Sequence, residues 1–148
     1  MKIDNLDEEI IFQGINHITF AVENLERSIR FYEIIFGVEP LAKGEKLAYF
    51  QIGDVWFALN VESKLKSDER QKTYTHIAFS MTESSQKILM KKLDHHCIAY
   101  ELGRSRNERE GHSVYIRDYD GHLIELHDLT LKDRLKYYSE MRKDIEIK

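Results

Sequence analysis

The chain lacks the residues and patterns that mark several classes of protein. Its single cysteine, Cys97, cannot form an internal disulfide. No apolar run approaches the roughly 20 residues of a membrane span, and no basic, apolar and small-residue pattern at the start indicates a signal peptide. With 22 basic and 26 acidic residues, the chain has no global positive field for nucleic acid or an anionic membrane. These absences predict a cytoplasmic protein that binds small molecules or other proteins.

What is present is a repeat. The segment Asn16–Phe20 is matched in kind by Tyr74–Phe79, and their histidines, His17 and His76, lie 76 − 17 = 59 residues apart. Both segments alternate polar and apolar residues, which is typical of half-buried strands. At 148 residues, 42% of them hydrophobic, the chain can bury one continuous core. A histidine at the same place in two strands therefore predicts a site built between two halves of one fold.

A helix and further strands are expected after each histidine strand. Asn24 is a favourable cap for a helix that ends at Gly37, and the alternating runs Leu47–Ile52 and Val55–Asn60 predict a hairpin. A polar surface connection is expected over 61–72. The second half repeats the order, with a helix and then strands near Cys97–Glu101, Ser113–Arg117 and Leu123–His127. The sequence therefore predicts an α+β fold with a βαβββ-like order in each half.

The predicted organisation is a single domain over 14–148, with modules at about 14–60 and 74–128. The acidic residues 1–13 are interpreted as a leader, and a last helix is expected over about 131–142. This helix begins at a capping box made by Thr130 and Asp133. Its apolar stripe consists of Leu131, Leu135 and Tyr138.

Strand parity places the polar side chains on one face of the predicted sheet. If that face is a cup, its wall contains His17, Thr19, Tyr49, Gln51, Trp56, Asn60, Tyr74, His76, Ser113, Tyr115, Arg117, Glu125 and His127. The opposite face is apolar and would pack beneath the helices. A polar, aromatic cup indicates a binding site, because buried polar groups cost free energy unless they meet partners or a ligand.

Two imidazoles and one carboxylate in the cup, His17, His76 and Glu125, suffice for a divalent metal with open coordination positions. The competing interpretation is that these strand histidines are structural. His127 is either a neighbour of the metal ligands or a rival ligand. The remaining histidines, His95, His96, His112 and His122, are expected to be solvated surface residues.

The loop Gly103–Gly111 places three arginines between two glycines, and guanidinium groups match phosphate-like anions. Arg134 near the start of the last helix is a second candidate for binding an anion. Glu108 and Glu110 keep open the alternative that the loop is simply solvated and mixed in charge.

The pattern resembles the vicinal oxygen chelate metalloproteins, and within them the fosfomycin-resistance proteins, over roughly 14–138. The matching phrases are Ile15–Ile18, Ala48–Phe50, Val55–Asn60, Tyr74–Phe79, Ser113–Tyr115, Asp120–His127 and Arg134–Tyr138. The resemblance implies two paired βαβββ modules that form a cupped mixed sheet with helices on its outer face. It also implies a homodimer with exchanged modules.

The same resemblance implies the roles of individual residues. His17, His76 and Glu125 would hold Mg²⁺ or Mn²⁺ and act in catalysis through it, with Tyr115 beside them. Substrate contacts would come from Thr19, Tyr49, Trp56, Asn60, Tyr74, Arg104, Tyr115 and Arg134. Cys97 is not needed as a nucleophile, because the thiol comes from the co-substrate.

The implied activity is opening of the fosfomycin epoxide by bacillithiol or L-cysteine, which confers antibiotic resistance. Trp56–Asn60 and the Gly103-Arg104-x-Arg106 loop match this thiol branch, whereas Thr19 matches the glutathione branch. The hydrolase branch has a glutamate where this chain has Leu47, although Glu45 lies nearby and Glu110-Gly111 and Tyr119-Asp120 look hydrolase-like. The alternatives are a fosfomycin epoxide hydrolase, a ring-cleaving dioxygenase and a non-catalytic antibiotic-binding protein of the same fold.

Overall fold

Each half of the chain forms a four-stranded sheet with one main helix. The computed structural model describes residues 11–148 apart from 66, 105 and 106, so most of the expected leader lies outside the described residues. The first module contains β1 (His17–Val22), α1 (Leu25–Phe36), β2 (Ala42–Lys43), β3 (Leu47–Ile52) and β4 (Val55–Val61). The second contains β5 (His76–Ser80), α3 (Glu83–His95), β6 (Glu101–Leu102), β7 (Ser113–Arg117) and β8 (Leu123–His127). A short helix, α2 (Ser67–Arg70), lies in the connection between them, and α4 (Leu131–Met141) follows the second module.

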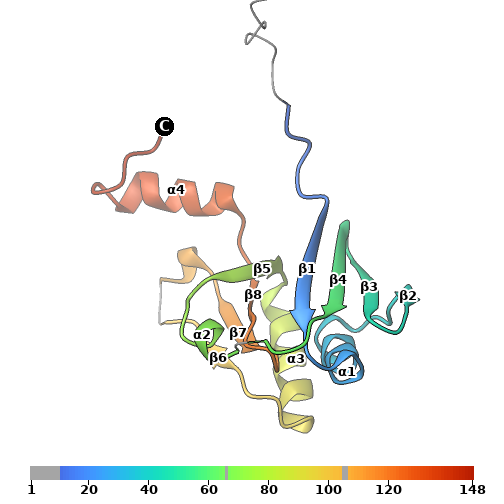
Figure 1. The fold of residues 1–148 in the computed structure, drawn as a ribbon. Coiled ribbons are helices and arrows are strands. Elements are labelled where there is room, and N and C mark those ends of the chain that lie inside the picture. Colours follow the sequence, from blue (N-terminus) through green and yellow to red (C-terminus); the bar gives the residue numbers. More distant parts are fainter. Residues whose placement is uncertain (1–10, 66, 105–106) are drawn as a thin grey trace, which may run out of the picture.

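The two sheets have the same topology. Their strand orders are β1-β4-β3-β2 and β5-β8-β7-β6. In each sheet the histidine strand pairs in parallel with the last strand of its module, and the other pairs are antiparallel. The sheets stand side by side, with α1 and α3 close together at one end of the molecule (Figure 1). The predicted α+β fold with two βαβββ modules is therefore confirmed.

Local sequence explains where the main helices begin and end. Asn24 caps α1 by accepting a hydrogen bond from the Arg27 N–H at 3.0 Å, and Gly37 ends the helix with φ of 68°. The capping box of Thr130 and Asp133 at the start of α4 is present as predicted. Among the described residues, no helix is long and apolar enough to cross a membrane.

One hydrophobic core joins both modules. The apolar strand face predicted from parity supplies half of its buried side chains: Ala48, Phe50, Phe57, Leu59, Val114, Ile116, Ile124 and Leu126. Phe57 lies at the centre, where its ring packs on Tyr32 and Phe36 of α1 and on Phe79 of the second module. A core shared in this way predicts that the modules unfold together.

Polar contacts also join the modules. The buried Tyr32 hydroxyl donates to Asp118 Oδ2 at 2.6 Å, and Asp120 Oδ1 accepts from the Glu23 N–H at 3.0 Å. His122 stacks on Phe20 with 4.2 Å between ring centroids and donates from Nε2 to the Ala21 carbonyl at 2.9 Å. The expectation that His122 is a solvated surface histidine is therefore wrong.

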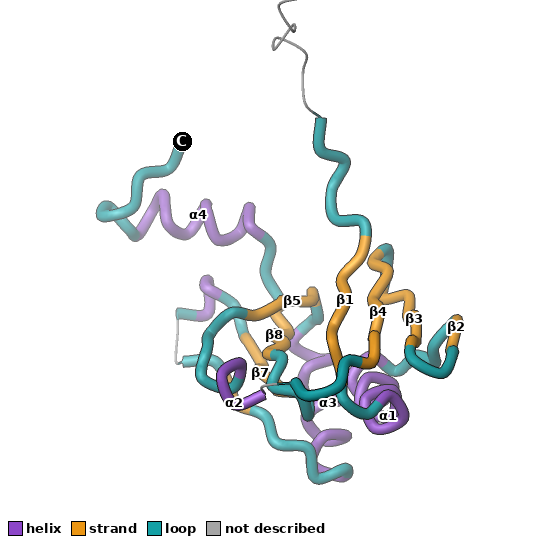
Figure 2. The backbone as a smooth tube through the Cα atoms, in the orientation of Figure 1, coloured by secondary structure: helices purple, strands orange, loops and turns teal. Residues whose placement is uncertain are grey.

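Several predicted boundaries are corrected. β2 was not predicted, because two exposed residues give no alternation. The strand expected near Cys97–Glu101 begins only at Glu101, because Cys97 has φ of 53° and lies in the turn after α3. The connection between the modules contains α2, and the described residues on either side of that helix form a loop (Figure 2).

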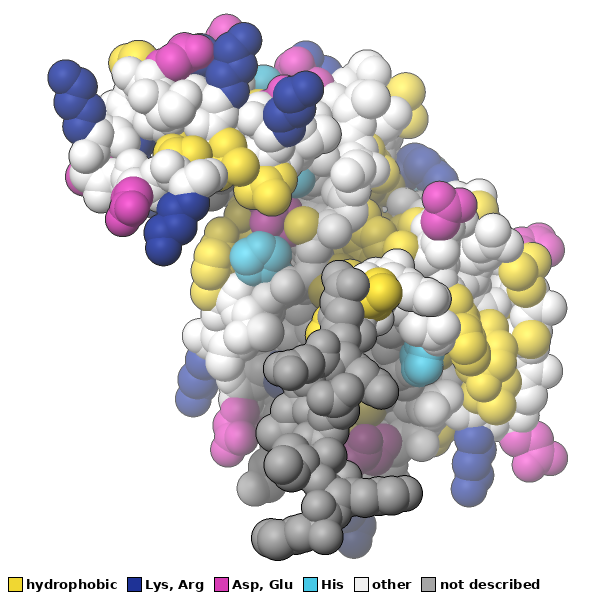
Figure 3. Space-filling view, turned by 90° about the horizontal axis from the view of Figure 1, so that it is seen from above, with side chains coloured by type: hydrophobic (Ala, Val, Ile, Leu, Met, Phe, Trp, Pro, Cys, Tyr) yellow, Lys and Arg dark blue, Asp and Glu magenta, His cyan; other side chains and the backbone are white. Residues whose placement is uncertain are grey.

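The apolar stripe predicted for α4 does not pack on the core of this chain. Leu131 is 73% exposed, and Leu135 and Met141 are also exposed. The helix stands away from the two sheets (Figure 1), and hydrophobic side chains are visible along its flank (Figure 3). Only Tyr137 of this helix is buried.

Candidate metal and substrate site

The structure brings two of the three predicted metal ligands together. His76 Nε2 on β5 lies 2.8 Å from Glu125 Oε2 on β8, the neighbouring parallel strand. Two ligands that sit at right angles on a small divalent cation, each about 2.1 Å from it, are about 3 Å apart. The spacing of this pair therefore fits two neighbouring ligands of one cation.

The tautomer of His76 also suits metal binding. Its Nδ1 is 2.7 Å from the Tyr74 carbonyl, which can only accept, so Nδ1 carries the proton. The Nε2 lone pair is then free to bind a cation. Glu125 is only 7% exposed, and a buried carboxylate needs compensating partners. A cation would supply one.

His17 is held through Nδ1 in the same way as His76, but it lies in the other sheet. Its Nδ1 is 2.7 Å from Asn16 Oδ1, which again leaves Nε2 free, and its ring packs against Trp56 with 4.5 Å between centroids. His17 is exposed at the start of β1, in the other sheet from His76 and Glu125. Within the described part of one chain, no three His, Cys, Asp or Glu residues are close enough to hold a metal. One chain therefore offers a pair of ligands and a separate single ligand.

Tyr115 connects the His76–Glu125 pair to a large pocket. It is the β7 neighbour of Glu125, its ring centroid lies 5.9 Å from that of His76, and its hydroxyl is 2.7 Å from that of Tyr74. Burial, the hydrogen bond with Tyr74 and the charge of Glu125 all raise the pKa of Tyr115. Its hydroxyl therefore remains protonated at neutral pH and can donate to an oxygen.

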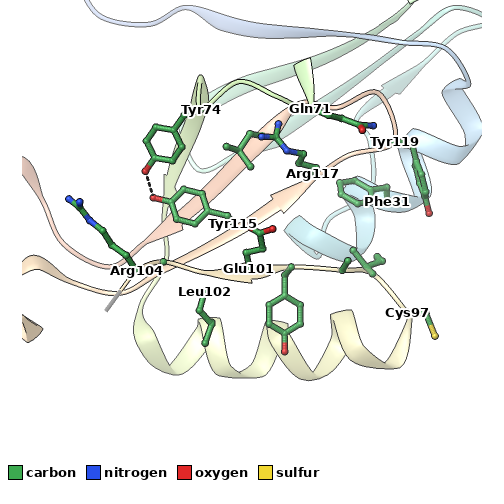
Figure 4. Close-up of a pocket in the computed structure, with 15 residues that line it drawn as sticks. Phe31, Gln71, Tyr74, Cys97, Glu101, Leu102, Arg104, Tyr115, Arg117 and Tyr119 are labelled. Carbon is green, nitrogen blue, oxygen red and sulfur yellow. Dashed lines mark hydrogen bonds between the residues drawn. The ribbon is translucent and has the colours of Figure 1, made fainter. Parts of the chain in front are cut away.

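The pocket has a volume of about 1020 Å³ and includes three predicted substrate contacts, Tyr74, Arg104 and Tyr115. Figure 4 shows the two tyrosine hydroxyls pointing toward each other, with Arg104 on the same side. Arg117, Tyr119 and Phe31 line its other end. Arg117 donates to the carbonyls of Thr73 at 2.7 Å and Gly121 at 3.0 Å, so it fixes the wall.

Two of the other arginines near the site, Arg109 and Arg134, have partners within the chain. Arg134 is half-buried and donates to the Glu110 carbonyl at 2.5 Å, and Arg109 pairs with Glu140 of α4. The loop Gly103–Gly111 was predicted to bind an anion through its arginines. Of these, Arg104 lines the pocket, Arg109 pairs with Glu140 of α4, and Arg106 lies outside the described residues. Arg134 of α4 contacts the loop at Glu110.

The remaining predicted substrate contacts lie on the first sheet. Thr19, Trp56 and Asn60 are exposed and Tyr49 is half-buried, and the rings of Tyr49 and Trp56 are 5.1 Å apart. None of the four lines the described pocket. They form, with His17, an open polar and aromatic face.

Ser113 was placed on the cup wall but received no role. Its hydroxyl donates to Glu125 Oε1 at 2.5 Å and lies 2.9 Å from His127 Nδ1. Parity with Glu125 and His127 was the signal available in the sequence. Serine is so common on strand faces that parity alone does not single it out.

Comparison with known proteins gives consistent results. The profile of the Glyoxalase/Bleomycin resistance protein/Dioxygenase superfamily matches residues 14–126. The metallothiol transferase FosB of Lysinibacillus sphaericus is 43% identical over 134 residues, which cover 90% of this chain and 95% of the relative. FosB of Staphylococcus epidermidis is 41% identical over 132 residues, which cover 89% and 95%.

A solved structure has the same fold. The fosfomycin resistance protein FosX of Listeria monocytogenes, in complex with Mn(II) and sulfate, aligns with a TM-score of 0.76 and 31% identity. The alignment covers 86% of this chain and 99% of that protein. A FosX variant with a TM-score of 0.75 was solved with Mn(II) and 1S,2S-dihydroxypropylphosphonic acid.

Proposed function

The chain belongs to the Glyoxalase/Bleomycin resistance protein/Dioxygenase superfamily, and we propose that it is a metallothiol transferase that opens the epoxide of fosfomycin with bacillithiol or L-cysteine. The relatives named metallothiol transferases and fosfomycin resistance proteins support this function. The observation that carries it is the position of Tyr115, which contacts Tyr74 at 2.7 Å, lies beside His76 and Glu125, and lines the pocket.

His17, His76 and Glu125 would hold the divalent cation, Mg²⁺ or Mn²⁺, which supplies Lewis-acid polarisation of the epoxide and phosphonate oxygens. The donor set fits, since His17 and His76 each keep Nε2 free and the ligand atoms of His76 and Glu125 already converge. Two nitrogens and one carboxylate oxygen leave positions open for substrate.

In the reaction the thiol sulfur attacks an epoxide carbon. A C–S bond forms as the C–O bond breaks, and the ring oxygen receives a proton equivalent to the one that the thiol loses. The protonated hydroxyl of Tyr115 orients a substrate oxygen by donating to it. Arg104 would neutralise phosphonate charge that otherwise repels the thiolate. Holding thiolate and epoxide in line contributes as much as about 7–11 kcal/mol to the barrier reduction.

Two features favour a thiol over water. Leu47 shares a face of β3 with Tyr49, opposite the buried Ala48, so a hydrocarbon stands where the hydrolase branch would have a base. The pocket of about 1020 Å³ is at the upper end of the range for drug-sized ligands. A three-carbon epoxide phosphonate fills little of it, which leaves room for a larger thiol.

The working unit in this proposal is a homodimer with exchanged modules. His17 lies in a different sheet from His76 and Glu125, and a second copy could bring the two together. The exposed apolar side chains of Leu131, Leu135 and Met141 on α4 also need a partner surface. His17 of one subunit would then complete the site of the other.

Product analysis tests the nucleophile. Protein, Mn²⁺ and fosfomycin are incubated with bacillithiol, cysteine, glutathione or no thiol, and products are identified by mass. We expect the bacillithiol or cysteine adduct. A diol that forms without thiol as fast as any adduct would assign the chain to the hydrolases. Glu45→Gln is the matched variant: it should leave the adduct rate unchanged, whereas loss of diol formation would identify Glu45 as the base for water.

A further inference from the structure

The two carboxylate oxygens of Glu125 have different partners. Oε2 lies 2.8 Å from His76 Nε2, whereas Oε1 accepts a hydrogen bond from the Ser113 hydroxyl at 2.5 Å. Ser113 and Glu125 are each only 7% exposed. The carboxylate is therefore held with Oε2 toward His76 and Oε1 toward Ser113.

His127 belongs to the same arrangement. A serine hydroxyl has one proton, and here Ser113 gives it to Glu125. The 2.9 Å contact between Ser113 Oγ and His127 Nδ1 must then be one in which the imidazole donates. His127 Nδ1, which also lies 3.5 Å from Glu125 Oε1, thus fixes the Ser113 hydroxyl, and Ser113 fixes Glu125.

The fold builds this chain of hydrogen bonds from paired strands and a close loop. Ser113 and His127 are direct partners in the β7–β8 ladder, and Glu125 and His127 share a strand face. Gly111 has φ of 81°, and a Cβ on it would lie 3.0 Å from His127 Cε1 and 2.6 Å from Asp128 Oδ1. Only glycine lets the loop backbone approach the imidazole so closely.

We propose that Ser113 and His127 are positioning residues that hold Glu125 as a ligand through Oε2 alone. The proposal rests on the proposed metal site. With Oε1 engaged by Ser113, the carboxylate cannot easily turn to bind through both oxygens. Binding through both oxygens is common for Ca²⁺, which accepts more ligands in looser geometry than Mg²⁺. The Ser113–His127 pair therefore favours a small cation and keeps its other positions open for substrate.

The test measures metal binding directly. Full-length protein stripped with a chelator is titrated with Mn²⁺, and free Mn²⁺ is followed by electron paramagnetic resonance. Neighbours that orient a ligand typically affect metal affinity by about 10–100-fold, so Ser113→Ala and His127→Leu should weaken Mn²⁺ binding by that factor. Ca²⁺ affinity should fall less, which narrows the preference for Mn²⁺ over Ca²⁺.

Two further variants separate positioning from general structure. His127→Asn keeps an N–H donor near the place of Nδ1 and should recover most of the Mn²⁺ affinity. Ser80→Ala is the matched serine control, because Ser80 is exposed on β5 and is the ladder partner of His127; its Mn²⁺ affinity should equal that of the parent. The urea midpoint of the metal-free protein should stay near that of the parent in His127→Asn and Ser80→Ala, whereas Ser113→Ala should lower it, because it removes the donor to the buried Glu125 Oε1.

The outcomes are distinguishable. Parent protein that binds no Mn²⁺ would overturn the proposed metal site and this inference with it. Parent protein that binds Mn²⁺, with Ser113→Ala and His127→Leu variants that bind equally tightly and keep the same cation preference, would overturn the positioning role alone. If Ser113→Ala does not fold, the difference between His127→Leu and His127→Asn decides.

Discussion

The two modules repeat one topology but present their polar faces differently. On the first sheet the histidine-bearing face is open, with His17 and Trp56 exposed. On the second sheet Ser113, Tyr115 and Glu125 are buried. Gly103 and Gly111 lie against Ser113 and His127, and the carbonyls of Arg70 and Thr73 accept from Arg117 of the same sheet. The difference shows that two sheets with the same strand order can carry one exposed and one buried polar face, in an open and an enclosed module respectively.

The enclosed module holds its groups in place before any ligand binds. Glu125 is held by Ser113, and the Nδ1 proton of His76 is fixed by the Tyr74 carbonyl. In the open module Asn16 contacts His17 Nδ1 in the corresponding way, and among the described residues His17 is exposed. We therefore expect substitutions in the enclosed half to change metal affinity and those between the halves to change stability.

The largest expected effect is loss of the metal. Chelator-stripped protein should regain one divalent site per chain when Mn²⁺ is restored, as measured by metal analysis after dialysis. His76→Ala should abolish that site, because it removes one of the two ligands that converge in the enclosed module. His95→Ala, at the exposed end of α3, is the histidine control and should bind fully. Full occupancy in the His76→Ala variant would remove the basis for the metal site.

A smaller effect is expected where the modules meet. Tyr32→Phe removes the hydroxyl that donates to Asp118 and leaves a buried carboxylate oxygen with one partner fewer. The free energy of unfolding in urea should fall by about 1–3 kcal/mol, in a single transition because both modules share one core. Tyr119→Phe, at a half-exposed tyrosine in the same turn, should change it by less than about 0.5 kcal/mol. Two separate transitions would show that the modules fold independently.

The smallest effect is a pH dependence at the end of the enclosed sheet. Burial raises the pKa of Asp128, but the hydrogen bonds from the backbone N–H and imidazole of His112 outweigh burial and hold this pKa below its usual value. The hydrogen bond to Asp128 in turn raises the pKa of His112. The Asp128 contribution to stability is lost as pH falls through its lowered pKa, and the His112 contribution is lost as pH rises through its raised pKa.

The pair should therefore stabilise the fold most between the ordinary pKa values of the two groups, about 4 and 6.5. Urea unfolding of Asp128→Asn at several pH values checks this. The stability difference from the parent should be greatest in that window and smaller at pH 8. A difference that does not vary with pH would contradict the sign of both pKa shifts.

Much of the fold could be predicted from local sequence because it depends on alternation and capping. The core face followed from the parity of strands such as Leu47–Ile52, and both ends of α1 followed from Asn24 and Gly37. β2 could not be found, since two exposed residues have no pattern. The role of His122 was missed because its partners, Phe20 and the Ala21 carbonyl, are about 100 residues away in the chain.

The site was predictable in composition but not in contacts. The repeat of His17 and His76 indicated candidate ligands. No sequence pattern showed that His76 lies beside Glu125 while His17 lies in the other sheet. The arginines illustrate the limit: Arg104 lines the pocket, whereas Arg109 and Arg134 pair with glutamates brought close only by α4. Which partner each arginine contacts depends on distances in the folded chain, and these cannot be predicted from composition and spacing.

The central claim is that the open half of one chain completes the enclosed half of another. His17→Ala and Glu125→Ala proteins, each inactive alone, are unfolded together and refolded as a mixture, and fosfomycin adduct formation is measured. With random pairing about half the dimers are mixed, and each mixed dimer has one site with both lesions and one with none, so about a quarter of the parent activity should return. Activity that stays at the level of the separate variants would show that all three ligands come from one chain and would contradict the account.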